Sequence, residues 1–193
     1  MSGSKMKKFI WYIEERIQQI NYRIKGILLS LFLRMNGNKV GKRLRCKQFP
    51  FLRCIPKGTL FIGNNVTMGI RITLEARGKI ILHDYVSLTQ DVFISSNKSV
   101  ELEDYVACGE YVTIRDTDHQ MRKNKLICEQ GSVSSPILLK KGCDINHGVT
   151  IFRGVTVEEG AVIGINTILM RNFVSVPYGI YMGNPVKMIS KRF

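Results

Sequence analysis

The sequence has few acidic residues, no closely spaced cysteine pair and no long apolar run, and the last two shortages each exclude a class of protein. Only 15 of its 193 residues are Asp or Glu, against 29 Lys or Arg. The five cysteines form no Cys-x-x-Cys pair, and without a cleavable signal they indicate reduced thiols rather than a disulfide framework. Charged residues interrupt each apolar stretch before it reaches about 18 residues, so no segment is predicted to span a bilayer.

The basic excess is concentrated in the N-terminal part of the chain. Residues 1–57 hold 14 Lys or Arg and 2 Asp or Glu, whereas residues 58–193 hold 15 and 13. A nucleic-acid-binding domain carries its basic residues over the folded surface, so we expect no nucleic-acid partner. Residues 1–5, which precede a second methionine at Met6, are typical of an expression scar.

Residues 6–57 are predicted to form a basic amphipathic helical arm. Between residues 7 and 35 apolar side chains recur at helical spacing, and Lys and Arg then cluster between residues 39 and 47. An interfacial helix in peripheral contact with an anionic membrane fits residues 7–47. A helix docked on the main domain or on a sister subunit is the alternative.

From residue 58 onward the sequence repeats at a fixed period. Five apolar positions recur twice with a step of 20 residues. The fifteen residues are Ile62, Val66, Met68, Ile72, Leu74, Leu82, Val86, Leu88, Val92, Ile94, Leu102, Val106, Cys108, Val112 and Ile114. From Leu139 to Leu169 apolar residues then recur every six, and glycines such as Gly148 occupy the turn positions. Neither a helix nor a half-buried strand has a period of six, whereas stacked short strands and turns of a parallel β-helix do.

One corner of the predicted solenoid is enlarged. In two earlier coils this corner takes eight residues between equivalent apolar positions, but it takes 25 between Ile114 and Leu139. The loop at residues 115–138 is mostly polar and contains the sequence DTDH. Long loops on a rigid scaffold are usually functional, so we expect this loop to carry site residues.

The hexads resemble those of the hexapeptide-repeat acyltransferases over residues 58–193, and the closing GNPVKMI is similar to the family's GNPAK signature. The resemblance implies an all-β fold, a left-handed parallel β-helix, here preceded by the basic amphipathic helix. The long loop and its histidine resemble those of sugar O-acetyltransferases, including enzymes that modify surface polysaccharides. The sequence departs from the pattern at residues 144–146, where DIN replaces the frequent WIG, and at Thr89 and Gln90, where galactoside acetyltransferases have an asparagine near the acceptor sugar.

Alignment of VTIRDTDH with these enzymes implies that His119 is the general base of a direct transfer without an acyl-enzyme. An imidazole with a pKa near neutrality suits proton removal from a hydroxyl, and it works best when an acceptor holds its other ring nitrogen. We expect Asp116 to be that acceptor, with Asp118 or a backbone carbonyl as alternatives. His147 and His83 are weaker candidates for the base.

The resemblance further implies acetyl-CoA as the acyl donor and a homotrimer with each active site between two subunits. Coenzyme A would run along the C-terminal coils, and Thr89 and Gln90 would lie near the acceptor. The positions that match coenzyme-binding positions of the family are Asn146, His147, Ile165, Arg171 and Lys187. No metal is expected.

The expected function is acetyl-CoA-dependent O-acetylation of a sugar hydroxyl of a cell-surface glycan or its precursor, by a cytoplasmic protein peripheral on the inner face of the cell membrane. N-acetylation of a nucleotide-linked amino sugar is the alternative within the same class. A γ-type carbonic anhydrase would bind zinc through three histidines, but its second and third ligands lie about five residues apart, and Asn124 stands five after His119. A non-catalytic membrane-docked scaffold would leave the enlarged corner unexplained.

Overall fold

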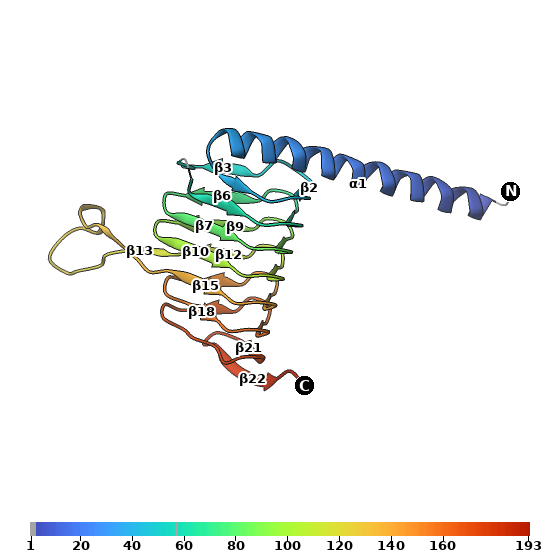
Figure 1. Cartoon of the computed structure of the whole chain (residues 1–193). Helices are drawn as coiled ribbons and strands as arrows, with labels where there is room; N and C mark the ends of the chain where they lie inside the picture. The colour runs from blue at the N-terminus through green and yellow to red at the C-terminus, as the bar shows by residue number, and fades with distance from the viewer. Residues whose placement is uncertain (1–2, 57) are drawn as a thin grey trace.

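The computed structural model describes residues 3–56 and 58–193, with side chains from residue 6 onward. It consists of one long helix, α1 (Gly3–Met35), and a stack of parallel β-coils (Figure 1). Of the predicted expression scar at residues 1–5, residues 1 and 2 lie outside the described residues and Gly3 begins α1. In the described part of the chain, no helix is long and apolar enough to cross a membrane.

Each coil contributes short strands to three sheets, here named A, B and C. Sheet A contains β1 (Lys39–Val40), β4 (Leu60–Ile62), β7 (Lys79–Leu82), β10 (Ser99–Leu102), β15 (Ile137–Leu139) and β18 (Thr156–Val157). Sheet B contains β2 (Arg45–Cys46), β5 (Thr67–Met68), β8 (Ser87–Leu88), β11 (Ala107–Cys108), β16 (Asp144–Ile145), β19 (Val162–Ile163), β21 (Gly179–Met182) and β22 (Lys187–Lys191). Sheet C contains β3 (Phe51–Arg53), β6 (Thr73–Ala76), β9 (Phe93–Ser96), β12 (Thr113–Arg115), β17 (Thr150–Ile151) and β20 (Ile168–Leu169). The predicted left-handed parallel β-helix is confirmed, with about seven turns.

The repeat positions form the interior of the solenoid, as predicted. All fifteen residues of the 20-residue repeat are buried, none more than 1% exposed. Parallel pairing stacks equivalent residues, so that Leu74 lies beside Ile94 and Leu82 beside Leu102. Burial of each such side chain stabilises the fold by about 1.5–3 kcal/mol. Some turns require a backbone with positive φ, which favours glycine. Gly148 has φ 69°, and a Cβ there would lie 2.1 Å from Oδ1 of Asn166.

The first coil begins earlier than the predicted boundary at residue 58. Strands β1, β2 and β3 pair in parallel with β4, β5 and β6. The step between these two coils is 22 residues rather than 20, which hides the repeat. The interior positions of the first coil are Val40, Leu44, Cys46 and Leu52. The helix of the predicted arm, residues 6–57, therefore ends at Met35, and the basic cluster at residues 39–47 lies on a β-coil.

Helix α1 lies across the N-terminal end of the coil stack, and its N-terminal part projects beyond the coils (Figure 1). Leu29 and Leu33 are buried against the first coil. A Cβ at Gly26 would lie 1.9 Å from the carbonyl oxygen of Leu44, so this close approach of helix and coil requires glycine.

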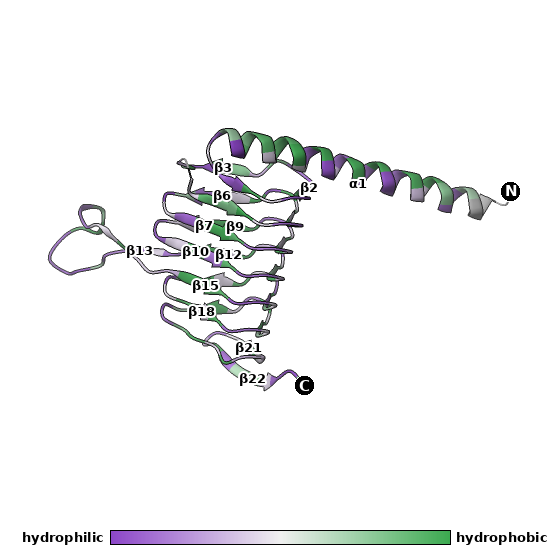
Figure 2. Ribbon diagram, in the orientation of Figure 1, coloured by the Kyte–Doolittle hydropathy of each residue, from purple (hydrophilic) through white to green (hydrophobic). Residues whose placement is uncertain are grey.

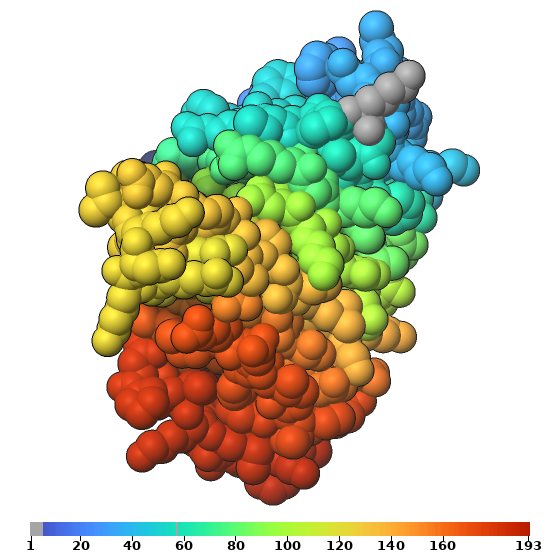
Figure 3. Space-filling model, turned by 90° about the vertical axis from the view of Figure 1, so that its left-hand side faces the viewer, coloured from blue at the N-terminus to red at the C-terminus, as the bar shows by residue number. Residues whose placement is uncertain are grey.

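The turns between two sheets stack on one another and form an edge of the solenoid. The solenoid has three such edges, and two of them carry most of the predicted site residues. The C–A edge includes the turns from sheet C to sheet A at residues 77–78, 97–98, 116–136 and 152–155. The B–C edge consists of the turns from sheet B to sheet C, at residues 47–50, 69–72, 89–92, 109–112, 146–149 and 164–167. The enlarged corner is on the C–A edge and stands out from the coils as the yellow loop of Figures 1 and 3.

Candidate active site

The enlarged corner begins at a buried carboxylate, Asp116, which has no exposed surface. Both of its oxygens accept hydrogen bonds, mainly from the turn of the preceding coil. The donors are Ser96 Oγ (3.0 Å), the backbone N–H groups of Asn97 (2.7 Å), Lys98 (2.7 Å) and Ser99 (2.9 Å), and Thr117 Oγ1 (2.8 Å). A buried carboxylate needs several donors to replace its lost hydration. Asp116 thereby fixes the start of the loop on the coil before it.

The loop opens with a two-stranded antiparallel hairpin formed by β13 (Thr117–His119) and β14 (Ser132–Ser134). Asp118 on β13 reaches the following coil, where its Oδ2 accepts a hydrogen bond from Nε of Arg153 at 2.9 Å. These side chains are only 24% and 15% exposed, and Nη1 of Arg153 also donates to Ser135 Oγ at 3.4 Å. The loop is therefore tied to the coil after it as well as to the coil before it.

His119 ends β13 and is exposed to solvent. Its backbone is fixed by pairing with Ser132, and its ring, unlike those of His83 and His147, has no polar side-chain partner among the residues that the structure describes. The predicted orienting partner, Asp116, uses both oxygens at the base of the loop instead. The alternative, Asp118, is paired with Arg153. In a single chain, His119 therefore lies on a fixed strand, and its imidazole is exposed to solvent without an orienting carboxylate from the described residues.

The outer part of the loop is closed by the side-chain amide of Gln130. Its Oε1 accepts a hydrogen bond from the backbone N–H of Arg122 at 2.7 Å. Its Nε2 donates to the carbonyl oxygens of Arg122 and Lys125, both at 2.9 Å. The 3₁₀ helix η1 (Ile127–Glu129) leads into this residue. These hydrogen bonds hold residues 122–130 together at the outer end of the loop.

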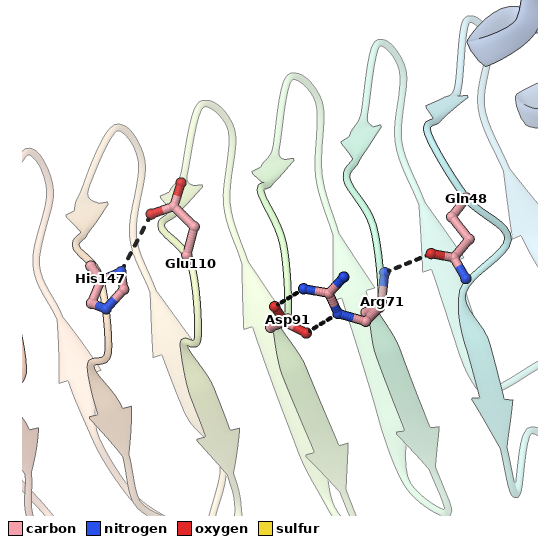
Figure 4. Close-up of polar contacts among 5 residues, drawn as sticks. All are labelled: Gln48, Arg71, Asp91, Glu110 and His147. Atoms are coloured by element: carbon pink, nitrogen blue, oxygen red, sulfur yellow. Dashed lines mark hydrogen bonds and ion pairs between the residues drawn. The ribbon is translucent and has the colours of Figure 1, made fainter.

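The predicted acceptor residues, Thr89 and Gln90, are on the B–C edge. They line a groove of about 260 Å³ that also includes Glu110. Figure 4 shows that Glu110 lies beside His147, with 3.6 Å between a carboxylate oxygen and Nδ1. The ring of His147 also packs edge-on against Tyr111, with 5.3 Å between the ring centroids. Glu110 was not predicted from the sequence; the 20-residue repeat, which stacks it beside Gln90, is the signal that indicates it.

Polar side chains connect successive coils along the same edge (Figure 4). Arg71 donates two hydrogen bonds to the carboxylate of Asp91, one of them from Nε at 2.6 Å, and its backbone N–H donates to Gln48 at 3.3 Å. Hydrogen bonding to Arg71 holds the pKa of Asp91 below its ordinary value, and the same contact raises the pKa of Arg71. The carboxylate of Asp91 therefore stays ionised and keeps the two coils linked.

The predicted coenzyme-binding residues are divided between different parts of the C-terminal coils. Asn146 is on the B–C edge, where its Nδ2 donates to the carbonyl oxygen of Ile163 at 3.0 Å. Ile165 is exposed on the same edge. Arg171 is exposed after β20, on the side of the C–A edge, and Lys187 is exposed on β22.

One chain does not bring the predicted site residues together. His119, Asp116 and Arg171 lie on the C–A side, whereas the acceptor residues and most of the coenzyme residues lie on the B–C edge. Arg153, absent from the residues predicted from the sequence, belongs with the first group. The hexad register, which places residue 153 at the next turn of the C–A edge, one coil after the loop, is the signal that indicates it.

The three histidines belong to three different edges of the solenoid. His83 follows β7, where its Nε2 lies 2.7 Å from Oε1 of Glu101, while His119 and His147 are on the C–A and B–C edges. Within residues 3–56 and 58–193, no group of three or more His, Cys, Asp or Glu side chains is arranged to hold a metal ion.

No family model matches the chain. The chain is 31% identical over 136 residues to a probable acetyltransferase of Mycobacterium tuberculosis, in a match that covers 69% of this chain and 44% of that protein. It is 45% identical over 49 residues to a probable macrolide acetyltransferase of Lysinibacillus sphaericus, covering 25% of this chain and 26% of that protein. The matches thus span less than half the length of either relative.

Solved structures share the fold at low sequence identity. A variant of AntD, an N-acyltransferase from Bacillus cereus in complex with dTDP-4-amino-4,6-dideoxyglucose and coenzyme A, has a TM-score of 0.71 at 21% identity, covering 85% of this chain and 89% of that chain. A hexapeptide-repeat acetyltransferase from Vibrio cholerae, complexed with acetyl-CoA, has a TM-score of 0.60 at 16% identity, covering 84% and 75%. These findings confirm the resemblance on which the expected fold rests.

Proposed function

Because this chain has the fold of the hexapeptide-repeat acyltransferases, we propose that it is an acetyl-CoA-dependent acetyltransferase acting on a sugar hydroxyl of a cell-surface glycan. The observation that most supports this proposal is the enlarged corner. A solenoid with short corners projects a polar loop, ties the base of that loop to the coils on both sides, and leaves His119 exposed at the end of β13. The two relatives named as acetyltransferases support the acyl-transfer class.

In this proposal His119 is the general base. Its imidazole takes the proton of the acceptor hydroxyl during attack, which typically accelerates such a reaction by about 10²- to 10⁴-fold. The hydroxyl oxygen bonds to the acyl carbon, the carbon–sulfur bond breaks, and His119 returns the proton to the leaving sulfur. Acetyl-CoA, when bound, supplies the acetyl group as a thioester. The ties at Asp116 and Asp118 hold β13 still, so that the base keeps one position.

In this proposal coenzyme A binds along the C-terminal coils. Arg171 and Lys187 are exposed cations that suit its phosphates. Ile165 is an exposed apolar side chain that suits its hydrocarbon segments, and Asn146 and His147 offer hydrogen-bonding groups beside it. We assign these five residues to the coenzyme and Thr89 and Gln90 to the acceptor.

The division of these residues between two sides of the solenoid supports a site shared by two copies. A closed ring of identical subunits brings one side of each copy against a different side of its neighbour. In a homotrimer the loop of one copy, with His119, would then face the B–C edge of the next. The acceptor residues and the base would meet only in the assembly.

N-acetylation of a nucleotide-linked amino sugar is the second candidate. The observation in its favour is the structural likeness to AntD, an N-acyltransferase solved with a dTDP-linked amino sugar and coenzyme A. An amine acceptor also needs a base to remove a proton, so the role of His119 is the same in both reactions.

The test is calorimetric titration of the full chain with acetyl-CoA, followed by acetyl-transfer assays with glycan precursors and with dTDP-linked amino sugars. His119→Gln is the informative variant, and His83→Gln, which changes a histidine on a different edge, is the matched control. We expect both variants to bind acetyl-CoA like the wild type. We expect His119→Gln to lose about 10²- to 10⁴-fold in transfer rate and His83→Gln to lose little.

The possible outcomes separate the proposals. No binding of acetyl-CoA by the wild type contradicts acetyl transfer as a whole. If the wild type binds acetyl-CoA and acetylates amino sugars but not glycan precursors, the second candidate is the function. Equal loss of transfer in both histidine variants contradicts the assignment of the base to His119.

A further inference from the structure

Helix α1 is attached to the coil stack along only one side of its C-terminal part. Gly26, Leu29 and Leu33 are buried against the first coil. Lys25 Nζ donates to the carbonyl oxygen of Lys47 at 2.9 Å, which fixes the helix at the same place. Toward its N-terminus the helix leaves the coils and continues into solvent (Figure 1).

A stripe of isoleucines runs along α1, through both the attached and the projecting part. The residues Ile10, Ile13, Ile17, Ile20, Ile24 and Ile27 are spaced alternately by three and four positions, and each is between 41% and 58% exposed. At 3.6 residues per turn they share one face, and that face is opposite the one formed by Gly26, Leu29 and Leu33. Figure 2 shows the hydrophobic residues of α1 recurring along its whole length. The isoleucine stripe therefore faces away from the coils.

Basic residues border the isoleucine stripe. On the helical projection Arg16 and Arg23 lie on one side of it, and Lys7 lies on the other side, beyond Glu14. The first coil adds exposed cations at its turns, including Lys42 and Arg43. Residues 1–57 contain 14 Lys or Arg and 2 Asp or Glu, so this end of the molecule is strongly positive. Near an anionic lipid surface each such residue contributes about 1 kcal/mol of attraction.

We propose that α1 lies flat on an anionic lipid surface, with the isoleucine stripe at the boundary between headgroups and acyl chains. A helix with one apolar face and basic flanks binds such a surface through apolar burial and electrostatic attraction together. Because the stripe faces away from the coils, insertion of this face leaves the solenoid and its loop in water. This inference does not depend on the proposed acetyl transfer.

A second copy of the chain is the competing occupant of the stripe. Isoleucine at both alternating positions suits bundles of three or more helices. Facing stripes would, however, bring together segments with a large excess of positive charge, and acidic partners for Arg16 and Arg23 are scarce, since Glu14 and Glu15 are the acidic residues of residues 1–57. An anionic lipid surface satisfies the apolar face and the charge at once, so the charge favours lipid.

The test is co-sedimentation of the full chain with vesicles of phosphatidylglycerol and phosphatidylcholine, compared with vesicles of phosphatidylcholine alone. Ile20→Glu changes the stripe, and Ile189→Glu is the matched control on β22, since the two isoleucines are 56% and 58% exposed. We expect the wild type to bind the anionic vesicles, and to bind less as salt is added. We expect Ile20→Glu to reduce the affinity at least about tenfold and Ile189→Glu to leave it unchanged.

Wild-type protein that stays in solution with anionic vesicles overturns the proposal, and so does equal binding by Ile20→Glu. Sedimentation velocity without lipid identifies the competing occupant. If Ile20→Glu forms smaller assemblies than the wild type while neither binds vesicles, the stripe belongs to a second copy and the proposal is wrong. Circular dichroism and melting of both variants show whether the fold is kept.

Discussion

The chain leaves the solenoid at two places, and the two excursions are built in opposite ways. The loop of residues 116–136 is polar and is tied at its base by two carboxylates, one buried and one paired with Arg153. Helix α1 is apolar along one face, and polar ties to the coils are found near its C-terminal end, at Lys25 and Arg34. The hydrogen bonds at the base of the loop fix the position of His119. The apolar face of α1 has no such contacts in the described part of the chain and is exposed as a surface. The loop is therefore suited to chemistry and the helix to docking.

The largest expected effect comes from cutting the tie at the base of the loop. Asp116→Ala leaves the backbone N–H groups of Asn97, Lys98 and Ser99 without their acceptor. We expect the free energy of unfolding to fall by about 3–5 kcal/mol, since each of these part-buried donors that is left unpaired costs about 1–3 kcal/mol. Urea unfolding measures this loss, and trypsin should cut the loop faster than in the wild type.

Glu129→Ala is the control for Asp116→Ala, because Glu129 is an exposed carboxylate of the same loop. It should change neither stability nor proteolysis. An Asp116→Ala protein as stable as the wild type, with an equally protected loop, would show that the loop does not depend on this carboxylate.

The second prediction compares the same residue type in the solenoid and in the helix. Ile114→Ala opens a cavity in the fully buried interior and should cost about 2–5 kcal/mol of unfolding free energy. Ile20→Ala removes the same atoms from an exposed face and should change stability by less than about 0.5 kcal/mol. Equal losses in urea unfolding would mean that the isoleucine stripe is already covered, by another copy or by the chain itself.

The interior of the solenoid was predictable because stacking repeats the same environment every 20 residues. Residues such as Met68, Leu88 and Cys108 follow that repeat and are all buried. The first coil was missed for a specific reason: its turn after β3 adds two residues, so Cys46 stands 22 positions before Met68. A longer turn breaks a periodic pattern without changing the strands that it connects.

The site was predictable only in part, because an irregular loop has no period. The enlarged corner and the presence of His119 on it follow from the interruption of the repeat. The contact between Asp118 and Arg153 joins residues 35 positions apart and depends on how the hairpin folds back onto the next coil. The role of Asp116 likewise depends on backbone N–H groups, which carry no signal in the sequence.

The third prediction concerns a substitution that weakens the ion pair between the loop and the following coil. Asp118→Asn keeps the shape of the side chain but removes the charge that pairs with Arg153. We expect a loss of about 1 kcal/mol in unfolding free energy, smaller than for Asp116→Ala because both partners keep some contact with water. If His119 is the base, the rate of acetyl transfer should fall while acetyl-CoA binding is kept. A transfer rate equal to that of the wild type would show that this tie does not position the histidine.

The smallest effect is expected at the exposed contact between Arg71 and Asp91, which serves as a reference for the partly buried tie of the loop. Because the pKa of Asp91 is depressed in the folded state, its contribution to stability is present above the ordinary aspartate pKa of about 3.9 and is lost as pH falls through the lower folded value. The difference in melting temperature between the wild type and Asp91→Asn should therefore shrink as the pH is lowered below about 4. Gln48→Ala removes a neighbouring contact that does not titrate, so its difference should not depend on pH in this way. If the Asp91→Asn difference stays constant through the acidic range, the ion pair does not link the two coils in solution.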